Sequence, residues 1–196
     1  MAYQTENEKK ALLILFKDFT SYHNANTISK QLGISRIGSM KLLKKLKAEN
    51  LVIATVIGKS TVYKPNMQDS YVLDLITFIL AEEANEFKRW KEEFKELFVD
   101  GRIILLYGST IRDYTKARDI DIMILRKAGD SGQIHKVISE KQQLLPKKIH
   151  AIDLTSQEFM KNVQNKQVAV IDIVKNAIIL YGQNKYAELL KNVSSL

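Results

Sequence analysis

The sequence predicts an α+β protein in three parts, residues 1–66, 67–98 and 99–196. In the first part, apolar residues at helical spacing precede two β-prone runs, which predicts a small unit of helices with a β-hairpin. The second part is a long helical pattern without Gly or Pro, which predicts a connecting helix. The third part opens with two apolar runs typical of buried strands and continues with helical patterns. We therefore expect it to combine buried strands with helices.

Charge is unevenly distributed along the chain. The 30 Lys and Arg residues exceed the 22 Asp and Glu residues by 8. The net charge is +7 over residues 1–66, −4 over residues 67–98 and +5 over residues 99–196. Contact with a polyanion is therefore expected chiefly in the N-terminal part.

The composition excludes several classes of protein. The chain has no cysteine, which excludes disulfides and thiolate metal sites and fits a reducing compartment. The first residues show no signal-peptide pattern, and no apolar run approaches the roughly 18 residues that span a bilayer. We expect a cytoplasmic protein without a membrane segment.

Residues 1–66 contain signals for three helices and a hairpin. Apolar spacing predicts helices over 6–22, 27–32 and 36–49. Thr27 and Ser35 are suitable N-caps for the second and third helices. Asn50 is suited to the left-handed residue after the third helix. The strands predicted over 51–57 and 61–64 are joined by Gly58-Lys59-Ser60, which is typical of a hairpin turn.

This part resembles the winged helix-turn-helix family in the run Ile28-Ser-Lys-Gln-Leu32-Gly33-Ile34-Ser35, followed by Leu43-Lys-Lys-Leu46 and Leu51-Val52. The resemblance implies that double-stranded DNA is the partner and that the second helix of the motif enters the major groove. The residues placed to contact DNA are Arg36, Ile37, Gly38, Met40, Lys41, Lys44, Lys59 and Lys64. Two alternatives remain open: the lysines form an ordinary solvated helix face, or the module binds protein or forms a dimer.

The connecting part, 71–98, places apolar residues near a seven-residue spacing. It predicts one long helix or two stacked helices. One interpretation is packing against the C-terminal domain. The other is a homodimer whose helices present two DNA-binding modules to two half-sites.

The third part contains a pair of aspartates that are candidate metal ligands. Asp119 and Asp121 begin a predicted strand, and residues two apart on a strand share a face. Neighbouring carboxylates repel each other and require compensation. A hard divalent cation, Mg²⁺ or Mn²⁺, supplies it and commonly shares its ligands with substrate phosphates. The pair therefore predicts a metal site.

The turn after the apolar run 103–107 has features that suit phosphate binding. Gly108 permits a sharp turn and close approach of the backbone to a ligand. Ser109 is a suitable N-cap for a short helix over 110–115, whose free N–H groups would face an anion. Together with the aspartates, this predicts a site for a nucleoside triphosphate and its metal ion.

Gly108-Ser109, nine intervening residues and Asp119-Ile120-Asp121 resemble the signature of the DNA polymerase β-like nucleotidyltransferase superfamily, in particular its minimal members. Many of those have Gly-Ser-x-Ala-Arg-Gly and then Ser-Asp-x-Asp. Arg112 matches this pattern, and the departures from it are Ile111, Asp113 and Arg118. The resemblance implies a nucleotidyltransferase fold, with a short mixed sheet flanked by helices, and phosphate contacts from Gly108 and Ser109. Further candidate phosphate contacts are Arg112, Lys116 and Arg118.

A third carboxylate is expected on the strand predicted over 148–154. Asp153 ends an otherwise apolar run, and the resemblance implies that it joins Asp119 and Asp121 as a catalytic and metal-binding residue. The alternative is that Asp153 caps a helix over 155–162. His150 projects from the other face of this strand and is expected to be structural or exposed. Helices are predicted over 133–144, 167–181 and 184–193.

Three functions are compatible with these features. The first is metal-dependent transfer of a nucleotidyl group from a nucleoside triphosphate to an unknown acceptor. The second is a transcription regulator whose C-terminal domain senses nucleotide or only dimerises. The third is an antitoxin-like nucleotidyltransferase that modifies a partner protein, such as a small helical toxin.

Overall fold

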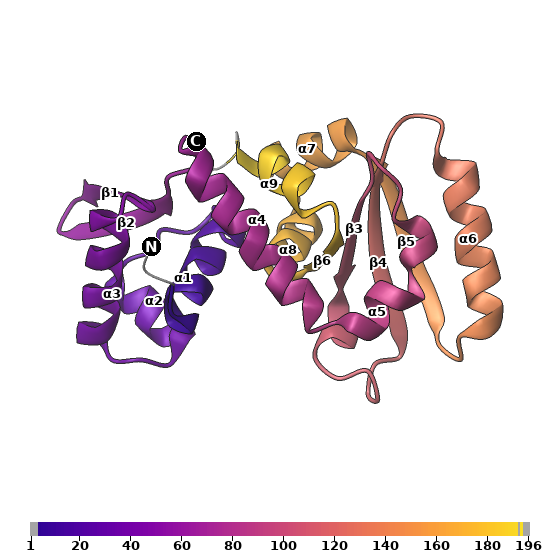
Figure 1. Cartoon of the computed structure of the whole chain (residues 1–196), viewed down its shortest axis with the longest axis horizontal. Helices are drawn as coiled ribbons and strands as arrows, with labels where there is room; N and C mark the ends of the chain where they lie inside the picture. Colours follow the sequence, from indigo (N-terminus) through magenta and orange to yellow (C-terminus); the bar gives the residue numbers. More distant parts are fainter. Residues whose placement is uncertain (1–3, 192, 194–196) are drawn as a thin grey trace. The chain divides into compact units, whose positions relative to one another are not determined.

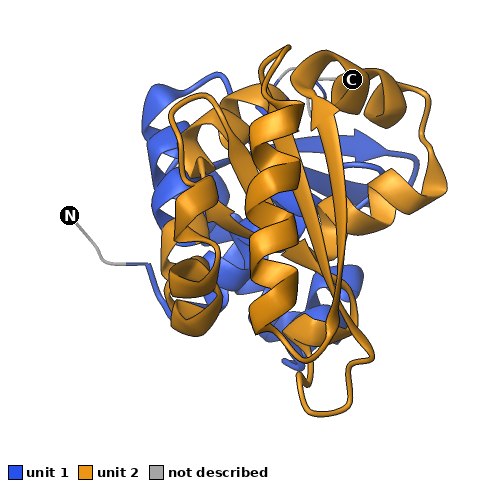
Figure 2. Ribbon diagram, turned by 90° about the vertical axis from the view of Figure 1, so that its right-hand side faces the viewer, with its two compact units in different colours: residues 1–79, 190–196 blue, residues 80–189 orange. Residues whose placement is uncertain are grey.

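The computed structural model describes residues 4–191 and 193, which form a mixed α+β protein with two sheets (Figure 1). The chain divides into two compact units (Figure 2). One comprises residues 1–79 with 190–196, and the other comprises residues 80–189. No helix among the described residues is both long and apolar enough to cross a membrane.

The first unit begins with three helices, α1 (Glu6–Lys17), α2 (Ala25–Leu32) and α3 (Arg36–Ala48). Each begins at a side-chain cap. Ser35 accepts a hydrogen bond from the N–H of Gly38 at 3.0 Å, which confirms it as the cap of α3. The cap of α2 is Asn24, three residues before Thr27, so this helix starts earlier than predicted. The fully buried apolar side chains of these helices include Leu12, Phe16, Ile28, Leu43 and Leu46.

A hairpin follows the helices. Strand β1 (Val52–Ile57) pairs antiparallel with β2 (Ser60–Pro65), with Ile57 opposite Ser60. The turn is therefore the two residues Gly58 and Lys59, and the φ of +59° at Gly58 is the left-handed conformation that such turns require. The hairpin predicted from sequence is confirmed.

Of the two forms predicted for the connecting stretch, one long helix is wrong, and the stretch contains two α-helices. It contains α4 (Ser70–Asn85), α5 (Lys88–Glu93) and a 3₁₀ turn, η1 (Lys95–Leu97). The break has no local signal, because no Gly or Pro occurs there. Trp90 and Phe94 are buried in the core of the second unit, and tertiary packing therefore interrupts the helix.

The second unit is built on a mixed sheet with the order β5-β4-β3-β6. Its strands are β3 (Ile103–Tyr107), β4 (Asp119–Arg126), β5 (Lys148–Thr155) and β6 (Ile178–Tyr181). β4 and β5 run parallel, whereas β3 pairs antiparallel with both β4 and β6. The mixed sheet matches the prediction, but β6 was predicted as part of a helix. That prediction is wrong because a short apolar run suits a buried strand as well as a helix.

Helices accompany the sheet: α6 (Ser131–Leu144), α7 (Ser156–Gln164), α8 (Val168–Asn176) and α9 (Gln183–Lys191). One face of the sheet contributes alternate residues of β3 and β4 to a buried cluster with Trp90 of α5, with Phe94 directly after α5, and with Ile134 of α6. These strand residues are Ile104, Leu106, Ile120, Ile122 and Ile124. The odd-numbered residues of β4, which include both aspartates, face the other side.

Candidate functional site

Asp119 and Asp121 lie side by side at the start of β4. The intervening Ile120 is fully buried in the core, and its burial fixes the two carboxylates on the opposite face. Asp121 pairs across the sheet with Tyr107, the last residue of β3. The shared face predicted for the two aspartates is confirmed.

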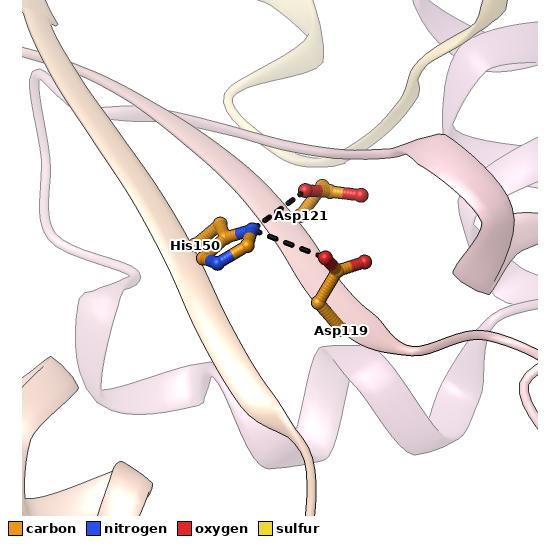
Figure 3. Close-up of side chains that lie close together, drawn as sticks. All are labelled: Asp119, Asp121 and His150. Carbon is orange, nitrogen blue, oxygen red and sulfur yellow. Dashed lines mark ion pairs between the residues drawn. The ribbon is translucent and has the colours of Figure 1, made fainter.

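His150 joins the pair from the neighbouring strand β5 (Figure 3). The parallel register sets His150 opposite Asp121. Its Nδ1 lies 3.2 Å from Oδ2 of Asp119 and 3.6 Å from Oδ1 of Asp121. The imidazole is exposed, as predicted, with 45% of its side-chain surface accessible. Sequence reasoning nevertheless missed its place in the site, because the register that brings it there is set between two strands.

The electrostatics of the pair favour a positively charged ligand. Partial burial raises the pKa of Asp121, the charge of Asp119 raises it further, and His150 opposes both effects. Burial, followed by the charges of Asp121 and Asp119, also raises the pKa of Tyr107 to about 12. The Tyr107 hydroxyl therefore stays protonated at neutral pH. A cation bound here would relieve the repulsion between the two carboxylates.

The turn after β3 packs directly against this pair. Gly108 has a φ of +77°, and a Cβ atom at this position would lie 2.1 Å from Oδ2 of Asp121. Thr110 donates a hydrogen bond from Oγ1 to the backbone carbonyl of Asp119 at 2.7 Å. The turn and the first residue of β4 are thereby held together.

The helix predicted after Gly108 takes a different form. Residues Gly108–Ile111 make a single 3₁₀ turn, η2, that begins at Gly108 itself. Ser109 therefore lies within its first turn and is not an N-cap, which corrects the prediction. The Ser109 carbonyl accepts hydrogen bonds from the N–H groups of Arg112 and Asp113, both at 3.1 Å. Residues 112–118 then form a loop that leads to β4.

The basic residues of that loop are exposed. Lys116 forms an ion pair with Asp113, with 3.2 Å between Nζ and Oδ2. Within the described part of the chain, no hydrogen bond or ion pair joins Arg112, Lys116 or Arg118 to the two aspartates. They remain candidate phosphate contacts on a solvent-facing loop.

Lys147, which precedes β5, anchors the same loop and was not singled out from the sequence. Its Nζ donates to the backbone carbonyls of Tyr114, Thr115 and Ala117, the last two at 3.3 and 2.6 Å. It also lies 4.2 Å from the centre of the Tyr114 ring. The guanidinium carbon of Arg89 is 4.1 Å from the centre of that ring. The loop between the turn and the aspartates is thus held by two cations from distant parts of the sequence.

Asp153 does not join the pair, which corrects its predicted position. It lies opposite Ile124 in the register, three residues beyond His150 and on the other face of the sheet. Its carboxylate accepts hydrogen bonds from Arg126 and Ser131 and contacts Nε2 of His135 at 3.1 Å. Burial alone would raise its pKa, but these hydrogen bonds outweigh burial and lower it. The alternative of a helix cap is not observed either, because Thr155 caps α7.

A basic groove of about 550 Å³ lies in the first unit, between α3 and the hairpin. Four of the predicted DNA-contact residues line it: Arg36, Met40, Lys44 and Lys59. The other lining residues are Asn24, Ala25, Asn26, Ser60, Thr61 and Tyr63. Ile37 and Lys41 are exposed, and Gly38 and Lys64 are partly buried, but these four do not line the groove.

Comparison with known proteins yields no match: no family model, no curated protein and no solved structure matches this chain.

Proposed function

We propose that the second unit is a nucleotidyltransferase that uses a nucleoside triphosphate and a divalent cation. The observation that carries the proposal is the contact between the glycine turn and the carboxylate pair. Gly108 leaves no room for a side chain beside Asp121, so backbone groups and carboxylates meet at one point. A triphosphate with its metal ion requires this combination of open backbone and oxygen ligands.

The donor set fits a divalent cation. Asp119 and Asp121 each offer a carboxylate oxygen and His150 offers a ring nitrogen, and these three atoms all lie within 4.8 Å of one another. When bound, the cation would withdraw electron density from the phosphate oxygens and neutralise developing charge. Gly108 and Ser109 would hold the phosphates close to the pair, and the exposed Arg112 could contact them from the loop.

In the proposed reaction, the hydroxyl oxygen of the acceptor forms a bond to the α-phosphorus of the triphosphate. The bond from that phosphorus to the bridging oxygen breaks, pyrophosphate leaves, and the hydroxyl proton passes to water. Asp119 and Asp121 would hold the divalent cation that binds the triphosphate, and so would fix the position of the phosphates for this step. Tyr107 is neutral beside the two aspartates, as a tyrosine is at pH 7, and its raised pKa of about 12 keeps it neutral at alkaline pH as well.

Calorimetric titration tests the binding step. Each of the four nucleoside triphosphates, with Mg²⁺ and separately with Mn²⁺, is titrated into the wild type and into Asp119→Asn/Asp121→Asn. Asp172→Asn, which changes an exposed residue of α8, is the matched control. We expect binding by the wild type and the control and none by the double variant. Failure of the folded wild type to bind any triphosphate would overturn the proposal.

Transfer itself is tested with α-phosphate-labelled triphosphate and a cell extract as the source of acceptor. We expect Asp121→Asn to abolish labelling while its circular dichroism spectrum stays that of the wild type. Unchanged labelling by this variant would remove Asp121 from the reaction.

We propose further that the first unit is a winged helix-turn-helix module that binds double-stranded DNA. Support comes from the order of three helices and a hairpin and from the basic groove. Arg36 and Lys44 from α3 and Lys59 from the hairpin turn place positive charge along one groove. Phosphates of a duplex are the ligands that such a surface attracts.

A second candidate function is nucleotide sensing by a DNA-binding regulator without transfer. The observation that favours it is His150, which stands where the neighbouring strand could have supplied a third carboxylate. Triphosphate binding without labelling of any acceptor, together with a change in DNA affinity on adding triphosphate, would favour sensing. Labelling that requires Asp121 would favour transfer.

A further inference from the structure

The ring of His150 is arranged as a third ligand. Its Nδ1 is 3.2 Å from a carboxylate oxygen of Asp119 and 3.6 Å from one of Asp121. Ligands held about 2.1 Å from a metal ion lie about 3.0 Å apart at the corners of an octahedron and about 3.4 Å apart at those of a tetrahedron. The two distances from the ring nitrogen are close to these values, and the three donor atoms all lie within 4.8 Å of one another.

The backbone explains why this nitrogen is presented to the carboxylates. β4 and β5 pair in parallel register, so Asp121 and His150 are direct neighbours on one face of the sheet. Both aspartates are only partly buried, and nearly half of the His150 side chain is accessible. A metal ion can reach the three donor atoms from solvent without rearrangement of the core.

The chemistry of the donors separates metal ions. Mg²⁺ takes oxygen ligands and retains several waters, whereas imidazole nitrogen suits Fe²⁺, Ni²⁺, Cu²⁺ and Zn²⁺. We propose that His150 makes this centre selective for a transition-metal dication over Mg²⁺. Mn²⁺, which has the lowest affinity of the first-row series for such sites, is the most stringent probe of this selectivity. The inference deepens the proposed function, on which it rests for the role of the metal in holding a triphosphate. It assigns to His150 a ligand role that the two aspartates alone do not require.

Metal titration of the whole protein, freed of any histidine tag, tests the selectivity. Mn²⁺ alone and Mg²⁺ alone are titrated into the wild type, His150→Asp and His150→Ala. We expect the wild type to bind Mn²⁺ at least tenfold more tightly than Mg²⁺. His150→Asp, which makes all three ligands oxygen, should reduce that ratio severalfold, and His150→Ala should weaken Mn²⁺ more than Mg²⁺. A ratio that is the same in all three proteins would overturn the inference.

Pulsed electron paramagnetic resonance of the Mn²⁺-loaded protein provides a readout that does not depend on activity. We expect a nitrogen coupling from a directly bound ring, and the coupling should change in protein labelled with ¹⁵N-histidine. His135→Ala is the matched control, because His135 is also exposed but contacts Asp153 on the other face. The coupling should persist in this control and disappear in His150→Asp. Bound Mn²⁺ without nitrogen coupling, or no metal binding by the folded wild type, would overturn the inference.

The two proposals fail in different ways. Nitrogen coupling with no triphosphate binding would retain the metal assignment and reject nucleotidyl transfer. Triphosphate binding with Mg²⁺ that is equal in the wild type and His150→Ala, with no nitrogen coupling to Mn²⁺, would reject the role of His150 and retain the nucleotide site.

Discussion

Gly108 and Asp121 are packed so closely that a Cβ atom on Gly108 would lie 2.1 Å from Oδ2 of Asp121. This contact joins the turn after β3 to the carboxylate pair on β4. A side chain at position 108 must displace the Asp121 carboxylate, because Tyr107, the residue before Gly108, is paired directly with Asp121 in the sheet.

We expect Gly108→Ala to abolish triphosphate binding and to lower the melting temperature. Two costs combine: the left-handed backbone, about 1–2 kcal/mol, and the displacement of Asp121. Gly129→Ala is the matched control, because its φ of +89° imposes the same backbone cost but a Cβ there meets no atom within 4 Å. Calorimetry and thermal melts should show that only Gly108→Ala loses binding. Equal losses of triphosphate binding in the two variants would show that backbone strain, and not the contact with Asp121, causes the loss.

Asp121→Asn should stabilise the folded protein at neutral pH while it abolishes function. The folded state raises the pKa of Asp121, so ionisation of this carboxyl destabilises the folded state as pH rises through the shifted pKa. Removing the charge should raise the melting temperature at pH 7 by roughly 2 °C, the change that about 1 kcal/mol gives in a chain of this size. The gain should vanish below about pH 4, where the wild-type carboxyl is protonated in both states. Thermal melts of the wild type and Asp121→Asn at pH 7 and pH 3 measure this gain. A lower melting temperature for Asp121→Asn than for the wild type at pH 7 would contradict the repulsion between Asp119 and Asp121.

Asp153→Asn should have the opposite effect on stability. The folded state lowers the pKa of Asp153, so its charge stabilises the protein above the unfolded pKa of about 4, and this contribution is lost as pH falls through the lower folded pKa. Breaking the charged hydrogen bond from Arg126 should cost about 2 kcal/mol at pH 7. Urea denaturation should show a smaller difference at pH 3 than at pH 7, with Asp172→Asn close to the wild type at both. If Asp153→Asn loses metal binding but no stability, Asp153 belongs to the metal site after all.

Lys147→Met should loosen the loop that precedes the aspartates. It removes the ammonium that binds three backbone carbonyls, while a side chain of similar length stays in place. We expect faster amide exchange over residues 112–118 and triphosphate affinity reduced by about tenfold, a loss of about 1.4 kcal/mol. The control is Lys148→Met, which removes the same charge at the adjacent, exposed position. If both variants behave alike, the effect belongs to net charge and not to the loop.

Arg36→Ala/Lys44→Ala should weaken DNA binding and reduce its dependence on salt. Loss of two phosphate contacts should reduce the slope of log affinity against log salt by about 2. Lys30→Ala/Lys47→Ala changes the net charge equally at exposed positions that do not line the groove. Titrations of duplex DNA at several salt concentrations should separate the two double variants. Identical slopes would mean that the groove is not the DNA-binding surface.

The local sequence was sufficient for the features that depend on one segment. The alternation of Asp119, Ile120 and Asp121 determined their faces, because a strand repeats every two residues. Gly58 determined the hairpin turn, and Ser35 determined the start of α3, because both act on their own backbone. The strand β6 was missed because its apolar run is too short to distinguish strand from helix.

The tertiary structure alone decided which residues meet. The pattern of β5 showed that His150 and Asp153 lie on opposite faces, but not which face adjoins the aspartates. The register between β4 and β5 decided that, and it placed His150 beside Asp121 and moved Asp153 away. The contact of Lys147 with the loop could not be predicted from one segment either, because its partners are about thirty residues distant in sequence. Periodicity within a segment determines what a residue faces, whereas pairing between segments determines what it touches.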